Sequence, residues 1–280
     1  MTAPTLPTPP KATSAGELFE LSLYGEGMER RFRRMRPEVT GMPWGTLDVT
    51  GMPPDDLIAA RKAWTGAAFQ EHRTGIACAA TLRALMECRA PLDLISVATR
   101  FPLDEMVHVE LCARMAMELG GGTEIVHDPD MLIVDGDLDK TPIVRAGDLV
   151  VRFFCVGEAL SIPLLRGTWK AAQHPLPRAV LGRIVKDEAA HGTFGFAFLD
   201  WARQFYEPED LAYLGRQADR AIRAIMRQWE ELKKRPPRPV RAGDPLAWME
   251  SGAYLALAQK SMQDKVVTPL RARDIPIAAF

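Results

Sequence analysis

The sequence predicts an all-α fold, built as a four-helix bundle with additional helices near its N- and C-terminal ends. Two observations carry this prediction. Four long apolar-rich stretches are punctuated by Gly and Pro, as helices in a bundle are. The first and third connections between these stretches are short and the second is long. Two helical hairpins joined by a crossover have connections in that order. The 280 residues are 47% apolar, which is enough to fill a sizeable core.

The region before the bundle is expected to be less regular. Residues 1–12, in which Pro and Thr dominate, are predicted to form a flexible tail. Residues 13–53 form an N-terminal extension, with an amphipathic helix at about 14–36 and a loop at 37–53 that contains repeated Gly and Pro. The helix carries a run of arginines that we interpret as a solvated face: Arg30, Arg31, Arg33, Arg34 and Arg36.

The bundle itself is assigned to residues 54–240. Carboxylates in the first turn, at Asp55 and Asp56, favour a helix start through the helix dipole. The three glycines at 120–122 end the second helix, and the Pro-x-Pro segment at 175–177 is expected to end the third. The predicted helices span about 54–89, 92–119, 145–173, 178–205 and 209–234, the last of them polar and on the outside.

Two further segments complete the chain. Residues 123–144 hold Asp, Pro and Gly among short apolar pairs, so we expect an irregular crossover, with room for a short strand or hairpin. Residues 241–280 form a C-terminal extension with a helical piece near 246–260.

Composition excludes several classes of protein. With 35 basic and 36 acidic side chains, the formal net charge is -1, which gives no electrostatic reason to expect nucleic acid or a membrane surface as a partner. No apolar stretch reaches membrane-spanning length. The four cysteines lie in apolar stretches without a Cys-x-x-Cys pair, as buried thiols in a reducing compartment do. The N-terminus lacks a secretory signal pattern, so a cytoplasmic location is expected.

Two copies of one motif carry the chemistry: Asp104-Glu105-Met106-Val107-His108 and Asp187-Glu188-Ala189-Ala190-His191. Residues three apart share a helix face, so each motif directs one carboxylate and one imidazole to the same point. Two such motifs, with one carboxylate from each of the other two helices, make a di-metal site of four carboxylates and two histidines.

The remaining two helices each offer a carboxylate. Glu158 stands alone in an apolar stretch, where an unpaired carboxylate is costly to bury. Glu71 lies midway along the first helix, whereas its rival Glu87 lies near the helix end. In each hairpin the chosen glutamate lies about four residues farther from the turn than the glutamate of the facing motif, so the two hairpins place their ligands alike. The predicted metal ligands, which are also the catalytic residues, are Glu71, Glu105, His108, Glu158, Glu188 and His191.

Over about residues 54–205 this pattern resembles the ferritin-like di-iron carboxylate superfamily. Its members include bacterial multicomponent hydroxylases, acyl-carrier desaturases, the ribonucleotide reductase small subunit and bacterioferritins. The resemblance implies that Asp104 orients His191 and that Asp187 orients His108, supporting the cofactor. A carboxylate on the far ring nitrogen fixes the histidine tautomer and raises its basicity. Related arylamine N-oxygenases carry an extra histidine where this chain has Ile184, which disfavours that subtype.

Ser161 is the weakest member of the predicted site. It follows Glu158 by one helical turn and would face the same cavity, where desaturases and hydroxylases place a hydroxyl. A serine bonded to its own helix backbone is the competing interpretation. Pro163 is expected to distort the same helix, because it leaves a backbone carbonyl without its usual donor.

Carboxylate and imidazole ligands without thiolate suit iron or manganese. The resemblance implies an O2-dependent di-iron oxidoreductase, of the hydroxylase, N-oxygenase or desaturase type. It would use two iron ions, with manganese as the alternative, and O2 as co-substrate. Its partners would be a small or carrier-bound organic substrate and an electron donor, and a homodimer is left open. The alternatives are a ferroxidase or iron-storage protein and another di-metal protein, such as a manganese catalase or a radical-storing subunit.

Overall fold

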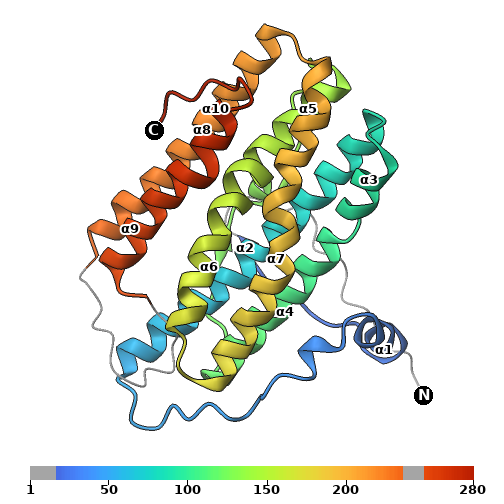
Figure 1. Cartoon of the computed structure of the whole chain (residues 1–280). Helices are drawn as coiled ribbons and strands as arrows, with labels where there is room; N and C mark the ends of the chain where they lie inside the picture. Colours follow the sequence, from blue (N-terminus) through green and yellow to red (C-terminus); the bar gives the residue numbers. More distant parts are fainter. Residues whose placement is uncertain (1–16, 236–248) are drawn as a thin grey trace.

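The computed structural model describes residues 17–235 and 249–280, and within these ranges the protein is all-α, as predicted (Figure 1). The strands in this part of the chain are the two-residue β1 (Glu17–Leu18) and β2 (Val126–His127), which pair antiparallel. The crossover therefore contains the short strand that the sequence allowed. Its partner is the N-terminal segment instead of a local hairpin.

The first helical hairpin pairs α2 (Pro54–Glu87) with α3 (Leu92–Ala98) and α4 (Phe101–Glu118), and α2 packs along α4. The prediction of one helix over 92–119 is wrong at residues 99–100, where the chain makes a turn. Pro102 explains the break. It lacks a backbone N–H, so it is tolerated in the first turn of α4 but would interrupt a continuous helix.

The second hairpin begins with α5 (Pro142–Leu149), continues through a π-helical segment (Val150–Glu158) and α6 (Ala159–Ala171), and returns along α7 (Pro175–Ala202). The third predicted helix ends at Ala171, close to the expected 173, and Pro175 occupies the first position of α7, three residues before the expected start at 178. No intrahelical hydrogen bond is lost there. Nδ1 of His174 caps α7 by accepting from the backbone N–H of Leu176 at 3.2 Å.

Pro163 lies inside α6, and the helix departs from α-geometry just before it, in the π-helical segment. The wider turn of this segment is accommodated by close packing against α7. A Cβ added at Gly195 would lie 2.7 Å from Sγ of Cys155, so only glycine allows this approach. Short π-helical insertions are frequent at functional sites.

The remaining helices lie outside the two hairpins. The helices α8 (Pro208–Lys233), α9 (Ser251–Ser261) and α10 (Thr268–Arg271) lie together on one side of the bundle (Figure 1). A second π-helical segment (Met262–Val267) joins α9 to α10. The helix α1 (Glu26–Met35) lies beside α4. Short 3-10 turns cover Pro37–Val39, Pro129–Leu132 and Arg203–Phe205.

Two boundaries at the chain ends differ from the predictions. The N-terminal helix is shorter than 14–36, since residues 17–18 form a strand. The C-terminal helical piece begins at Ser251 and its helical structure runs on to Arg271. The predicted tail at 1–12 lies outside the described residues. No helix of the described part of the chain is long and apolar enough to cross a membrane.

The core consists of two apolar clusters. One contains Phe101, Phe154, Phe194 and Phe198, and the other contains Trp64, Val107, Leu111 and Ile184, each with smaller neighbours. Along both α4 and α7, the Asp-Glu-x-x-His motif lies between residues of the two clusters. The fold therefore places the ionisable residues of both motifs inside the bundle and surrounds them with apolar side chains.

Candidate metal centre

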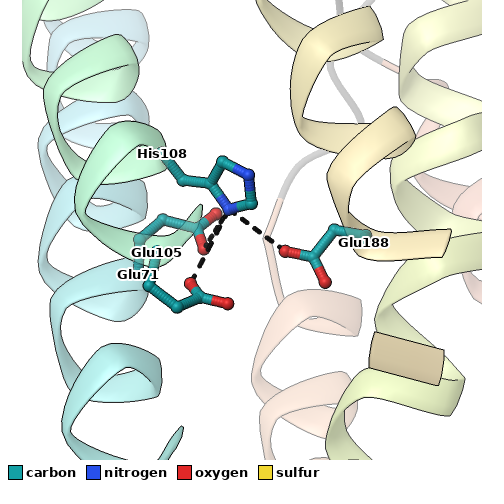
Figure 2. Close-up of side chains that lie close together, drawn as sticks. All are labelled: Glu71, Glu105, His108 and Glu188. Carbon is teal, nitrogen blue, oxygen red and sulfur yellow. Dashed lines mark ion pairs between the residues drawn. The ribbon is translucent and has the colours of Figure 1, made fainter. Parts of the chain in front are cut away.

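Six side chains from four helical elements meet inside the bundle as two overlapping groups. Ligand atoms of Glu71, Glu105, His108 and Glu188 all lie within 4.8 Å of one another. Figure 2 shows these four side chains gathered around the ring of His108. A second group, under the same distance limit, contains Glu105, Glu158, Glu188 and His191. Glu105 and Glu188 belong to both groups. The two groups could therefore hold two cations that share these two carboxylates.

The histidine rings are oriented alike. Nδ1 of His108 lies 3.2 Å from Oε1 of Glu188, and Nδ1 of His191 lies 3.1 Å from Oε2 of the same residue. The opposite ring nitrogens face the aspartates. Nε2 of His108 lies 3.5 Å from Oδ2 of Asp187, and Nε2 of His191 lies 3.5 Å from Oδ2 of Asp104. Each aspartate therefore contacts the histidine of the other motif, in the crossed pairing that the resemblance implies.

The residues present fit a pair of metal ions. Both carboxylate oxygens of Glu105, Oε2 of Glu188, and Nδ1 of both histidines are buried and have no hydrogen-bond partner among the described residues. Leaving so many polar atoms buried and unpaired is costly. Two divalent cations between the groups would satisfy them, and the four carboxylates would balance the charge of both ions.

Without a metal, the same groups perturb one another strongly. Burial raises the pKa of Glu71 to about 8, and burial together with Glu188 and Glu105 raises the pKa of Glu158. Burial disfavours the charged form of His191 too, but contacts with Asp104, Glu105 and Glu188 outweigh it and raise its pKa to about 12. The pKa of His108 is raised in the same way. The metal-free centre therefore retains protons where metal ions would otherwise bind.

A network of arginines holds the two aspartates from behind. Asp104 and Asp187 are fully buried. Arg36 donates to both, to Asp187 at 2.9 Å and to Asp104 through a shorter contact. Arg100 also reaches both aspartates at 2.9 Å, and Arg183 binds Asp187. Burial alone would raise the aspartate pKa values, but the histidines and these guanidinium groups lower them.

The interpretation of the arginine run as a solvated face is wrong for two of its members. Arg36 is 7% exposed, and Arg33, half-buried, pairs with Glu110 of α4. The other three arginines of the run are exposed. After α1 the chain enters the 3-10 turn at Pro37–Val39. At the start of this turn, Arg36 reaches the buried aspartates of α4 and α7. Sequence reasoning had no means of separating Arg36 from its neighbours.

Arg100 and Arg183 were also missed, although the sequence carries a signal for them. Each stands four residues before the aspartate of its own motif, the spacing at which side chains meet on a helix. The repeated order Arg-x-x-x-Asp-Glu-x-x-His was therefore readable in both helices. Its meaning is that each helix supplies an aspartate together with a counter-ion.

The other predicted residues occupy distinct positions. The hydroxyl of Ser161 donates to the backbone carbonyl of Glu158 at 3.1 Å and also lies 3.4 Å from Oε2 of Glu158. It thus has the backbone bond of the competing interpretation and a contact with the cluster as well. Glu87 lies at the end of α2, where it pairs with Arg145 at 3.2 Å, away from the cluster.

The two sides of the centre differ in exposure. The side chains of Glu105, His108 and His191 are fully buried, and the aspartates and Arg36 close the histidine side. Glu71 is the most exposed of the six residues, with 16% of its side chain accessible. Solvent therefore reaches the six side chains mainly at Glu71, on α2.

Comparison with known proteins adds no relative: no family model, no curated protein and no solved structure matches the chain.

Proposed function

We propose that the chain is a member of the ferritin-like di-iron carboxylate superfamily and acts as an O2-dependent oxidoreductase on a small or carrier-bound organic substrate. The observation that carries the proposal is the sharing of Glu105 and Glu188 between the two groups of ligand atoms. Shared carboxylates would hold two cations next to each other. Two adjacent iron ions would supply electrons for the reduction of O2, and an external donor would restore them.

The residues of this chain have separable roles in the proposal. Nδ1 of each histidine and the four glutamates would hold the metals, with Glu71 and Glu158 each serving one ion. Asp104 and Asp187 would hold the proton on Nε2 of the facing histidine, which keeps Nδ1 free to bind. The arginines keep these aspartates ionised and exclude water from the histidine side.

The competing function is that of a ferroxidase, in which Fe(II) itself is the substrate. The partial exposure of Glu71 favours it, because ferrous ions would enter and leave on that side as readily as an organic substrate would approach. The two functions require the same centre. They differ in whether iron stays at the centre or passes through it.

An iron titration tests the proposal and separates the two functions. Anaerobic protein is loaded with Fe(II), the bound iron is counted, and the solution is mixed with O2. The proposed oxygenase binds two iron ions per chain, oxidises no more than these, and needs added reductant for further O2 uptake. A ferroxidase continues to oxidise added Fe(II) without reductant. Failure to bind two ions per chain would contradict both.

A further inference from the structure

A pocket of about 540 Å³ lies between α2, the π-helical segment Val150–Glu158, the crossover and α8. Pockets of this size hold small organic molecules. Its α2 wall includes Gln70 and Thr74, which flank Glu71 in the chain. Its opposite wall includes Phe153, in the same segment as Glu158. The pocket thus lies between the two elements that supply the unshared glutamates.

The lining of the pocket has two parts. Met131, Ile133, Val134 and Phe153 provide an apolar surface. Ile133 is 66% exposed and Met131 is 44% exposed, values that leave apolar area free for a bound molecule to cover. A ligand with an apolar body would bury this area, and its binding would be favoured in proportion to the apolar surface removed from water.

The polar part of the lining has an excess of positive charge. Arg73, Arg152 and Arg220 line the pocket. Arg152 is neutralised by Asp148, with contacts of 2.7 and 3.1 Å. In contrast, Arg73 and Arg220 form no ion pair within residues 17–235 and 249–280, and they donate hydrogen bonds to the neutral amides of Gln70 and Gln217. Nε of Arg73 is buried and has no hydrogen-bond partner in the same part of the chain.

Two acids also line the pocket, but they do not cancel this charge. Asp135 is paired with Arg83 at 2.6 Å. Among the described residues, the unpaired charges of the lining are then one acid, Asp130, and two arginines, Arg73 and Arg220. The lining therefore keeps one net positive charge, which a negatively charged ligand could neutralise. A guanidinium group binds a carboxylate through two parallel hydrogen bonds, and that geometry would use the free donors of Arg73.

We propose that this pocket binds the organic substrate of the centre and that the substrate is a free organic acid with an apolar body. Its carboxylate is held by Arg73 and Arg220, and its apolar part lies on Met131, Ile133 and Phe153. The proposal rests on the proposed function, because it assigns to the metal centre a pocket bordered by Gln70 and Thr74, in the part of α2 that carries Glu71.

A binding series tests the charge requirement. Hexanoate and benzoate are titrated into the protein by calorimetry, with hexanamide and benzamide as neutral probes of equal shape. We expect the acids to bind at least about tenfold more tightly than the amides, the effect of one charge-assisted pairing. The variants Arg73→Gln and Arg220→Gln should each remove most of this difference. Arg227→Gln, on an exposed arginine of α8 outside the pocket, should leave it intact.

A second measurement tests the position of the pocket. In Mn(II)-loaded protein, the paramagnetic ions should broaden the proton lines of bound hexanoate, and Zn(II)-loaded protein should not. Equal binding of acids and amides, or binding that survives both arginine variants, would overturn the proposal. If either of these results were found while both arginine variants still bound two metal ions, the substrate assignment would be wrong and the proposed metal centre would be unaffected. Loss of metal loading in the unaltered protein would instead refute the proposed function.

Discussion

Arg36 donates from Nη2 to Oδ2 of Asp187 at 2.9 Å, although the two residues are separated by 151 positions in the chain. The same guanidinium also binds Asp104. One arginine of the N-terminal extension therefore joins the aspartates of both motifs, on two different helices. The extension is part of the structure that orients the histidines and not an independent appendage.

Replacing Arg36 by Ala should lower the free energy of unfolding by about 2–4 kcal/mol, because two buried carboxylates lose a charged partner while Arg100 still supports them. Urea unfolding measures the change. Arg31→Ala, at an exposed arginine of the same run, is the matched control and should stay within about 0.5 kcal/mol of the unaltered protein. Equal stability of the two variants would show that the buried contacts carry no net energy.

The ligand groups predict different metal stoichiometries for different glutamates. Glu71→Gln should cost one bound ion and leave the other, because Glu71 belongs to one group only. Glu188→Gln should weaken both ions, because Glu188 belongs to both. Elemental analysis after gel filtration counts the ions. Glu87→Gln, in a partly exposed ion pair at the end of α2, should retain both. Identical losses for Glu71→Gln and Glu188→Gln would contradict the shared-carboxylate arrangement.

Metal binding should release protons at pH 7. In the metal-free protein, the pKa of Glu71 is raised to about 8 and that of His191 to about 12, so both groups hold protons at this pH. A metal ion must displace these protons, so apparent affinity should rise with pH, and proton release should decline between pH 7 and pH 9 as Glu71 ionises first. Calorimetry in buffers of different ionisation enthalpy counts the protons. Binding with no proton release at pH 7 would refute the raised pKa values.

Two glycine substitutions should change stability in opposite directions. At Gly195, an added Cβ would lie 2.7 Å from Sγ of Cys155 and 3.1 Å from the backbone nitrogen of Cys155. Gly195→Ala should therefore cost about 1–3 kcal/mol through overpacking, and should weaken metal binding by shifting the segment that carries Glu158. Gly66, in α2, has no atom within 4 Å of the added Cβ position, so Gly66→Ala should stabilise the protein by about 0.5–1 kcal/mol. Denaturant unfolding of both variants measures this contrast, and a stabilised Gly195→Ala would contradict the close packing.

The sequence predicted the two hairpins because helix patterns and turn residues are local. The Glu-x-x-His spacing also indicated which face of each helix turns inward, and the distance of Glu71 from the turn distinguished it from Glu87. These inferences need only helix geometry and the lengths of short connections. They hold before any tertiary contact is known.

What could not be predicted depends on packing between distant segments. The π-helical turn at 150–158 exists together with the close approach of Gly195, which no local pattern encodes. The burial of Arg36 depends on the path of the chain after α1, in a run where several arginines look equivalent. The break at 99–100 was accessible in principle through Pro102, but proline in a first helical turn and proline as a terminator look alike in one sequence.

The central claim is that the chain holds two metal ions that share Glu105 and Glu188. A crystal structure of iron-loaded protein, with anomalous scattering recorded on both sides of the iron edge, tests it most directly. We expect two anomalous peaks about 3.5–4 Å apart, one beside Nδ1 of His108 and one beside Nδ1 of His191. A single peak, or iron bound elsewhere while the six side chains keep the contacts described here, would contradict it.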